Sequence, residues 1–329
     1  MSETTSIEWT ATRNEDGTVT PGSSWNPIRG TAGRHTCARI SPGCDNCYAA
    51  TMNRRGLMGT APLDYGQGEN LLDPARLDEK ALLQPLKWKA PRKVFVCSMT
   101  DLFGTWVPDE WIDRIFAVMA WAPQHTFIVL TKRAKRMQEY LSRPDLEDRV
   151  THAMCDICML TNGRACGFGG DDCQLEGTAM PLDNVWAGVT IEEDRYSWRA
   201  NYLRQTPAAV RWISAEPLIG GLPSLDLTGI DWLVAGGESG PKSRPMHPDW
   251  ARDLRDRCAA SGTAYFFKQW GAFAQDDGVV SSKHVHVPYS QNVADSEQHP
   301  MATMIRVGNH RSGRRLDGRE HNDYPAVPA

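Results

Sequence analysis

The sequence predicts an α/β protein whose parallel sheet curls into a partial (β/α) barrel of the TIM type. Two observations support this: short apolar runs alternate with amphipathic stretches, and polar residues follow nearly every run. The runs are apolar at consecutive positions, as expected for parallel strands buried on both faces. They cover residues 93–97, 126–130, 185–189, 210–214, 231–235 and 264–268. Repeated strand-then-helix units produce a parallel sheet with right-handed crossovers.

Helices between the runs are expected at residues 108–121, 132–141 and 248–260. The last has Pro248 in its first turn and Gly262 just beyond its end, the usual places for these two residues at helix termini. The sequence therefore predicts clear boundaries for this helix.

One connection is too long to be a single helix. The surplus is residues 151–177, which we interpret as a small inserted module. The barrel then has a first part, residues 1–150, and a second part, residues 178–272. The alternation stops near residue 273, so residues 273–329 are expected to form a C-terminal extension, either an appendage or a partly ordered tail.

The 329-residue chain has a formal net charge of −4 and nine cysteines. No apolar run approaches the length that crosses a membrane, and the polar N-terminus does not resemble a secretory signal. We expect a cytoplasmic protein without a membrane partner, in which cysteines serve as metal ligands before they form disulfides. The mild negative charge argues against indiscriminate binding to long duplexes.

Cys37, Cys44 and Cys47 lie in the run CARISPGCDNCY with the spacing C-x6-C-x2-C. Three thiolates can bind three irons of a cubane cluster and leave the fourth iron open, whereas a fourth cysteine normally completes an electron-transfer cluster. An open iron is a reaction site. Zinc also binds clustered thiolates, so the cysteines alone do not identify the metal.

Charged residues follow the predicted strands. In parallel α/β barrels these positions meet at the carboxyl-terminal mouth, where active sites are built. A shared cavity would make the acids and one lysine candidates for catalysis. The alternative for any single residue is a surface ion pair or a helix cap. The catalytic candidates are Asp101, Lys132, Glu192, Glu216 and Glu238, with Lys268 at an equivalent position.

A second cysteine group lies within the predicted insert. Cys155, Cys158, Cys166 and Cys173 have the spacing C-x2-C-x7-C-x6-C. Four thiolates with a CxxC step suit tetrahedral zinc, which would fold a module too small for its own core. They could equally hold an auxiliary iron–sulfur cluster or remain without metal, because spacing does not fix the metal.

Several runs resemble a known family. They include SWNPIRG, CARISPGCDNCYA, VFVCSMTDLFGTWVPDEWI, WISAEPLIGGL and WLVAGGESGPKSRPMHPDWARDLRDRC, and they span roughly residues 24–271 in order. The sequence is similar to the phage Gp37/Gp68 family, also called the three-Cys-motif family. Its members resemble divergent radical S-adenosylmethionine (SAM) enzymes.

This resemblance implies a barrel of the radical SAM kind with a [4Fe–4S] cluster on the loop after the first strand. Cys37, Cys44 and Cys47 would bind three irons, and SAM would bind the fourth. One-electron reduction by an electron donor would then cleave SAM to a 5′-deoxyadenosyl radical. The protein aims such a radical and excludes water. Tyr48 matches a position at which radical SAM proteins often place an aromatic residue near the adenine.

Two features depart from the usual radical SAM pattern. Most of these enzymes have C-x3-C-x2-C spacing, and a Gly-Gly-Glu-like stretch after the second strand contacts the SAM amino group. Here the second strand precedes SMTD, so Ser98 and Asp101 are the positional candidates for this contact. Glu238 and Ser239, in the later GGESG run, are further cofactor-binding candidates.

The substrate is expected to be a nucleobase or nucleotide, free or in DNA, that the enzyme repairs or modifies. This expectation rests on the phage association of the family and on a basic C-terminal segment, residues 306–319. Trp270 is a candidate for stacking on a base. The alternatives are a zinc-stabilised protein that binds nucleic acid or another partner without radical chemistry, and a metal-dependent barrel hydrolase that uses the mouth carboxylates.

Overall fold

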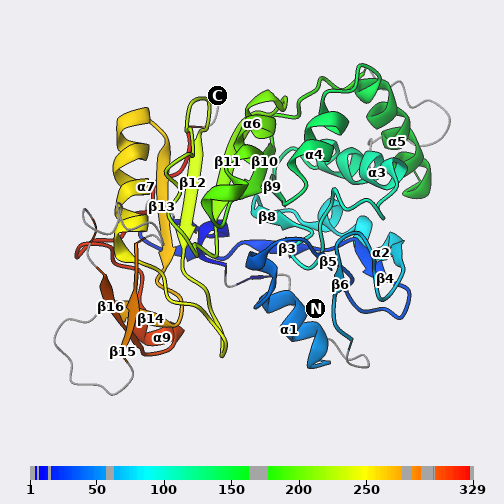
Figure 1. The fold of residues 1–329 in the computed structure, drawn as a ribbon. Coiled ribbons are helices and arrows are strands. Elements are labelled where there is room, and N and C mark those ends of the chain that lie inside the picture. The colour runs from blue at the N-terminus through cyan, green and yellow to red at the C-terminus, as the bar shows by residue number, and fades with distance from the viewer. Residues whose placement is uncertain are drawn as a thin grey trace.

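The structure is a computed structural model, and it describes residues 4–5, 7–13, 16–56, 63–162, 177–275, 284–289, 299 and 301–326. A seven-stranded parallel sheet forms its centre and curls into half a barrel (Figure 1). The strands, from one edge to the other, are β13 (Ala264–Gln269), β12 (Trp232–Gly236), β11 (Val210–Ala215), β10 (Val185–Thr190), β9 (Thr126–Thr131), β8 (Lys93–Val96) and β3 (Ser23–Trp25).

The predicted partial barrel is therefore confirmed as a parallel half barrel, and all six predicted strands belong to it. The sequence did not single out β3, because a three-residue edge strand has too few residues for a visible pattern. It pairs in parallel with β8, with Ser24 opposite Phe95. Every residue of β10 and β12 is buried, which explains their unbroken apolar runs.

The outer face of the sheet packs against helices. They follow the strands in the usual alternation, and Figure 1 shows α7 beside β12 and β13 while α3, α4 and α5 lie at the other end of the sheet. Phe127, Val189 and Phe267 face this side and share one core with helical residues such as Ile112 and Leu254. The helices are α3 (Asp109–Ala120), α4 (Ala134–Leu141), α5 (Leu146–Leu160), α6 (Trp198–Gln205) and α7 (Pro248–Ser261).

The predicted helices agree with α3, α4 and α7 to within one or two residues at each end. Gly262 ends α7 with a left-handed φ of 75°, as the sequence predicts. The predicted start of the insert, at residue 151, lies inside α5 and not between two elements. The first ten residues of the predicted insert extend a helix that begins at Leu146, and Val150, Ala153 and Ile157 bury its apolar stripe in the main core.

The inner face of the half barrel is filled by aromatic side chains. Trp212 and Trp232 pack against Trp9, which lies in the short helix η1 (Glu8–Thr10), at ring-centroid distances of 5.2 and 6.2 Å. Gly188 makes room for this layer, because a methyl group at that position would lie 2.2 Å from the Trp212 indole nitrogen. The N-terminal segment thus replaces the missing half of the barrel near the amino-terminal ends of the strands.

Part of the C-terminal extension reinforces the same layer. Tyr324 stacks on Trp232 at 5.4 Å, and its hydroxyl donates to the carbonyl oxygens of Trp9 and Ala11. Lys93 lies over the Tyr324 ring at 3.4 Å. The two ends of the described chain therefore meet at the inner face of the sheet.

The rest of the extension forms a small antiparallel sheet beyond β13 (Figure 1). It consists of β14 (Phe273–Gln275), β16 (Ala302–Arg306) and β15 (His284–Val287), followed by α9 (Asn309–Ser312). Leu316 is fully buried after α9. The described part of residues 273–329 is thus packed on the barrel rather than extended into solvent.

The remaining elements are short. They are the antiparallel pairs β1 (Thr12–Arg13) with β2 (Val19–Thr20) and β4 (Ile28–Gly30) with β7 (Ala75–Leu77), the parallel pair β5 (Ala38–Arg39) with β6 (Gly66–Gln67), the helices α1 (Tyr48–Arg54) and α2 (Glu79–Leu82), and the 3-10 turns η2 (Pro42–Cys44), η3 (Pro85–Lys87) and η4 (Asp194–Tyr196). None of the helices in the described ranges has the length and apolar character needed to span a bilayer.

Replacing Trp9 with alanine is expected to lower the free energy of unfolding by about 3–5 kcal/mol, because it empties a fully packed aromatic site. Trp198→Ala is the matched control: its side chain is 45% exposed, and the expected change is about 0.5 kcal/mol. Urea unfolding followed by circular dichroism measures both. Equal, small effects of the two substitutions would show that the N-terminal segment does not complete the core.

Candidate functional site

The three N-terminal cysteines lie on a loop that follows β3 and leads into α1. Pro42, Gly43 and Cys44 form the turn η2, and Cys47 directly precedes α1, whose first residue is Tyr48. Each thiol is partly buried. Cys37 and Cys47 also pack beside Met99, which follows β8. The motif therefore lies at the carboxyl-terminal end of the first strands, as the family resemblance implies.

The three thiols lie close enough to affect one another electrostatically. Burial raises the pKa of Cys37 and of Cys47; Asp101, Cys47 and Cys44 raise the pKa of Cys37 further, and Cys44 raises that of Cys47. Two cations act in the opposite direction: Arg133 lowers the pKa of Cys37, and Lys132 lowers that of Cys47. The protein thus gathers three partly buried thiols beside basic groups, and nearby positive charge favours the thiolate form that binds metals.

The thiols do not converge on a single point. Within the part of the chain that the structure describes, no three His, Cys, Asp or Glu side chains are near enough to hold one metal ion. The polar contacts of the thiols are weak: Cys37 Sγ lies 3.8 Å from the Ala38 carbonyl oxygen, and Cys44 Sγ lies 3.8 Å from Ser41 Oγ.

Glu192, just after β10, anchors the cysteine loop. Its side chain is fully buried, and it accepts hydrogen bonds from Lys132 Nζ at 3.0 Å, Arg199 at 2.8 Å and the Ser41 hydroxyl. A methyl group on Gly43 would lie 2.9 Å from Glu192 Oε1. Burial opposes the charge of Glu192, but the two cations outweigh it and hold the pKa of this carboxyl below its ordinary value.

Glu238, after β12, anchors the other side of the same loop. Its Oε2 accepts from Asn46 Nδ2 at 2.9 Å and from the backbone N–H of Arg244 at 2.8 Å. The Arg244 guanidinium donates to Glu238 Oε1 at 2.5 Å and to the Pro42 carbonyl oxygen at 2.8 Å. Arg244 therefore links the Gly-rich loop after β12 to the turn that carries Cys44.

Asp101 organises the loops after β8 and β9. Its Oδ1 accepts from Thr131 Oγ1 at 2.6 Å and from the Phe103 N–H at 3.0 Å. Its Oδ2 accepts from the Lys132 N–H at 3.2 Å and from Arg133 at 3.0 Å. Four donors occupy this carboxylate, so it fixes the positions of the two cations near the thiols.

Glu216 forms an ion pair with Lys268 and, within the described part of the chain, does not contact the cysteine loop. It lies 3.0 Å from Lys268 Nζ, and the two side chains are 13% and 20% exposed. Burial raises the pKa of Glu216, and Lys268 opposes this shift. The pair joins β11 to β13 across Gly236, where a methyl group would lie 2.6 Å from Glu216 Oε1. Of the five catalytic candidates, Glu216 alone has no hydrogen bond to the cysteine loop or its anchors among the described residues.

The predicted cofactor-binding residues surround the loop in different ways. Tyr48 is half exposed, and its hydroxyl donates to the Ser98 carbonyl oxygen at 2.9 Å. The Ser98 hydroxyl bonds to the amide of Asn26, just after β3. Ser239 accepts from Gln269 at 2.9 Å. The structure thus brings Tyr48 and Ser98 together beside Cys47, whereas Ser239 lies with β13.

The structure bears on two groups of residues expected to contact a nucleotide, Trp270 and the basic segment of residues 306–319. Trp270 is only 4% exposed, its indole N–H donates to the Arg315 carbonyl oxygen at 2.8 Å, and its ring packs edge-on against Phe267. The prediction that it stacks on a base is wrong, because the C-terminal segment covers it. In the basic segment, Arg306 bonds to carbonyl oxygens of the loop after β12, while Arg311 and Arg315 are exposed.

The second cysteine group is described only in part. Cys155 and Cys158 lie on α5, where Cys155 is partly exposed and Cys158 is buried and disulfide-bonded. Cys166 and Cys173 lie outside the described residues. The interpretation of this group as a zinc or auxiliary cluster site stays a prediction.

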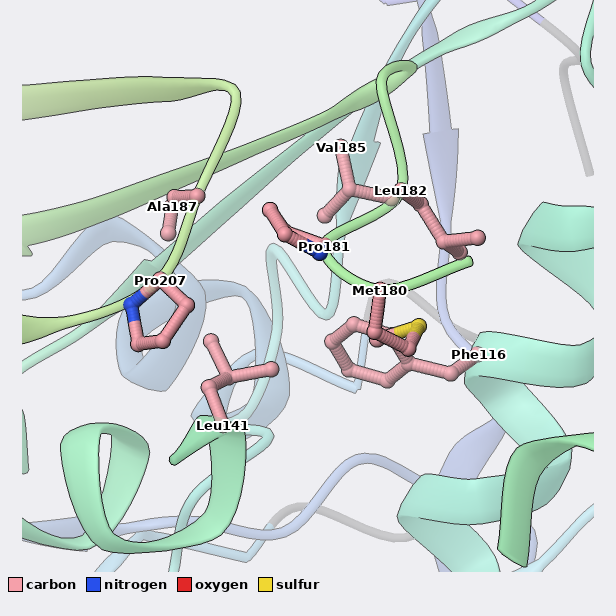
Figure 2. A pocket seen from close by; sticks show the side chains of 9 residues that line it. Phe116, Leu141, Met180, Pro181, Leu182, Val185, Ala187 and Pro207 are labelled. Carbon is pink, nitrogen blue, oxygen red and sulfur yellow. The ribbon is translucent and has the colours of Figure 1, made fainter. Parts of the chain in front are cut away.

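A hollow on the outer side of the sheet is unrelated to the mouth. Figure 2 shows it between Phe116 of α3, Leu141 of α4 and the segment from Met180 to Ala187. Every side chain that lines it is apolar. It carries no group that could act on a substrate and is a packing gap between the sheet and its helices.

Sequence reasoning missed the residues that hold the cysteine loop or support its anchors, namely Ser41, Asn46, Arg133, Arg199 and Arg244. Most of them contact residues distant in the chain; Asn46 and Glu238, for example, are 192 positions apart, whereas Arg199 lies seven positions after Glu192. One signal was available for Arg244, because it follows Glu238 by six residues within the GGESGPKSR run.

Replacing Glu192 with glutamine is expected to destabilise the protein by about 3 kcal/mol at pH 7, because it leaves Lys132 and Arg199 without their buried counter-charge. The pKa of Glu192 is lowered in the folded protein, so its contribution is present above the ordinary glutamate pKa of about 4.3 and is lost as the pH falls through the lower folded value. The difference in free energy of unfolding between wild type and E192Q should therefore close below about pH 4.

Urea unfolding at several pH values measures this gap. Glu193→Gln is the control, because its partner Arg195 is exposed and the expected change is about 0.5 kcal/mol. A gap of the same size at pH 7 and at pH 3.5 would contradict the assigned role of the Glu192 charge.

The comparisons with known proteins identify a family but no activity. A family model described as "Protein of unknown function (DUF5131)" matches residues 4–325. Searches of curated proteins and of solved structures find no match. Because the family model covers nearly the whole chain, this protein belongs to the DUF5131 family.

Proposed function

We propose that this protein is a radical SAM-type enzyme that acts on a nucleobase or nucleotide, either to repair it or to modify it. The observation that carries the proposal is the position of three partly buried thiols on one loop at the carboxyl-terminal end of a parallel half barrel. This end is where α/β barrels place their reaction sites. The resemblance to divergent radical SAM enzymes agrees with the same three residues.

The number of thiolates favours a cluster over a structural zinc ion. Structural zinc sites have four protein ligands, whereas three thiolates can bind three irons of a cubane cluster. Three thiolates leave one iron for SAM.

Cys37, Cys44 and Cys47 would hold such a cluster, which would supply an electron to the SAM sulfonium and so make radical chemistry available. The chain's own residues hold and enclose the reactants. Glu192 and Arg244 fix the cysteine loop from two sides. Lys132 and Arg133 place positive charge beside the thiols. The exposed ring of Tyr48, with its hydroxyl held by the Ser98 carbonyl, offers a flat surface for the adenine of SAM.

The metal-dependent hydrolase has less support. A metal-binding carboxylate needs free lone pairs, but Asp101, Glu192 and Glu238 each accept three or more hydrogen bonds from protein donors. The nucleotide substrate draws support from the exposed Arg311 and Arg315 in the C-terminal segment, which suit contacts with phosphate.

Changing Cys37, Cys44 or Cys47 to alanine is expected to abolish binding of iron and sulfide at this loop after anaerobic reconstitution, and with it the formation of 5′-deoxyadenosine from SAM under a strong reductant. Cys258→Ala is the control, since this thiol is buried in α7 and should leave both readouts unchanged.

Iron and sulfide analysis with chromatography of the SAM products measures these effects. Cys155, Cys158, Cys166 and Cys173 could hold a second cluster and retain iron in every variant. The quantity compared is therefore the decrease in iron content from wild type to each variant. Zinc bound by the three-cysteine loop, or 5′-deoxyadenosine formed without it, would refute the proposed function.

A further inference from the structure

Three exposed cations near the mouth have no counter-charge. Lys242 lies in the loop after β12, and Arg311 and Arg315 follow β13 in the C-terminal extension. Within the described residues, none of these three side chains forms an ion pair or a hydrogen bond. The cations that anchor the cysteine loop, by contrast, are occupied by buried carboxylates.

The exposed carboxylates of the same region are paired with other arginines. The pairs are Asp45–Arg244, Asp317–Arg252, Asp317–Arg255 and Glu320–Arg314. The three unpaired cations therefore leave a local surplus of positive charge, although the whole chain has a formal net charge of −4. An anionic ligand can bind to these cations without first breaking an ion pair of the protein.

Hydrogen bonds place the three cations around the mouth. Asn46 of the cysteine loop donates to the Lys242 carbonyl oxygen at 2.9 Å. Trp270, just after β13, donates through its indole N–H to the Arg315 carbonyl oxygen at 2.8 Å. Arg311 belongs to α9, which lies on the same, lower side of the sheet as α1 in Figure 1. The surplus charge thus extends from the cysteine loop to the end of β13.

An exposed aromatic ring lies at the same end of the sheet, after β10. Trp198 begins α6 and is 45% exposed, and Tyr202 packs edge-on against its ring at 5.8 Å. The Arg199 guanidinium lies 5.7 Å from the centre of the Trp198 ring and contacts Glu192 Oε2 at 2.8 Å. Tyr202 and Arg199 therefore hold the ring beside an anchor of the cysteine loop, and nearly half of Trp198 remains open to a ligand.

We infer that Lys242, Arg311, Arg315 and Trp198 form a strand-binding surface for a single-stranded nucleic acid, which presents the target base of the proposed enzyme. The cations contact phosphates, and a base beside the target stacks on the indole. Because a duplex keeps its bases stacked on one another, it offers none to Trp198.

The width of the surface favours a polymer over a free nucleotide. The strands β10 and β13 are three intervals apart in the sheet. This is about 14 Å along the sheet, or about four stacked nucleotides. A single nucleotide cannot contact Trp198 and Arg315 together, whereas a short strand can.

This inference rests on the proposed function for the target base, but its test does not need the cluster. A fluorescein-labelled single strand of about 12 nucleotides, within the usual range of site sizes, is titrated with the full-length protein and followed by anisotropy at several salt concentrations. DNA and RNA strands are compared, and the tighter one identifies the natural polymer. Three phosphate contacts predict that the logarithm of the association constant falls with the logarithm of the salt concentration with a slope of about −2.

Each kind of contact has its own variant. Lys242→Ala, Arg311→Ala and Arg315→Ala should each make this slope shallower by about 0.7. Trp198→Ala should weaken binding about tenfold at an unchanged slope, because the indole carries no charge. Lys89→Ala is the control: this exposed cation precedes β8, at the opposite end of the strands, and its loss should change neither quantity. Circular dichroism confirms that each variant is folded.

A duplex of the same sequence and a single nucleotide should bind at least about tenfold more weakly than the strand. Absence of strand binding, a duplex bound equally tightly, full affinity in folded Trp198→Ala, or an unchanged salt slope in the variant that combines the three cation changes would overturn the surface. These outcomes leave the proposed function standing if 5′-deoxyadenosine formation still depends on Cys37, Cys44 and Cys47. Strand binding by a protein whose three-cysteine loop takes up no iron would keep the surface and reject the radical chemistry.

Discussion

The buried carboxylate of Glu192 is the interaction on which the mouth of this half barrel depends. It follows β10 and joins the end of β9, the helix α6 and the cysteine loop, through Lys132, Arg199 and Ser41. A fully desolvated charge is tolerated only with such partners, because an unpaired one would cost several kcal/mol. The loop with Cys44 is therefore fixed by electrostatics, and Glu238 with Arg244 repeats this arrangement on its far side.

The side chains on the inner face of the sheet change from aromatic to polar along the strands. Near the amino-terminal ends, Trp9, Trp212 and Trp232 fill the concave face that an incomplete barrel would otherwise expose. Toward the carboxyl-terminal ends the inward positions become polar, from Ser214 to Glu216 on β11 and at Lys268 on β13. A dry aromatic base beneath a charged rim gives the mouth a rigid floor and strengthens the ion pairs above it.

The half barrel could be predicted from the sequence because buried parallel strands and amphipathic helices leave strong local patterns. The same reasoning placed Glu192, Glu216 and Glu238 at one end of the sheet. It did not reveal their partners, since Arg199, Arg244 and Asn46 meet them only through the tertiary fold. It also assigned Trp270 to the mouth, where the strand ends, although the C-terminal segment buries it through Arg315. The edge strand β3 and the continuity of α5 past residue 151 depend on packing against neighbours that no short pattern records.

The most direct test of the account is electron paramagnetic resonance of the anaerobically reconstituted, reduced protein, recorded with and without SAM. If the proposed function is correct, the reduced protein gives a [4Fe–4S] signal that changes when SAM is added, because SAM would bind the iron that Cys37, Cys44 and Cys47 leave open. The change should be lost in the triple alanine variant and retained in Cys258→Ala. A signal that is indifferent to SAM, or its persistence without the three cysteines, would contradict the account.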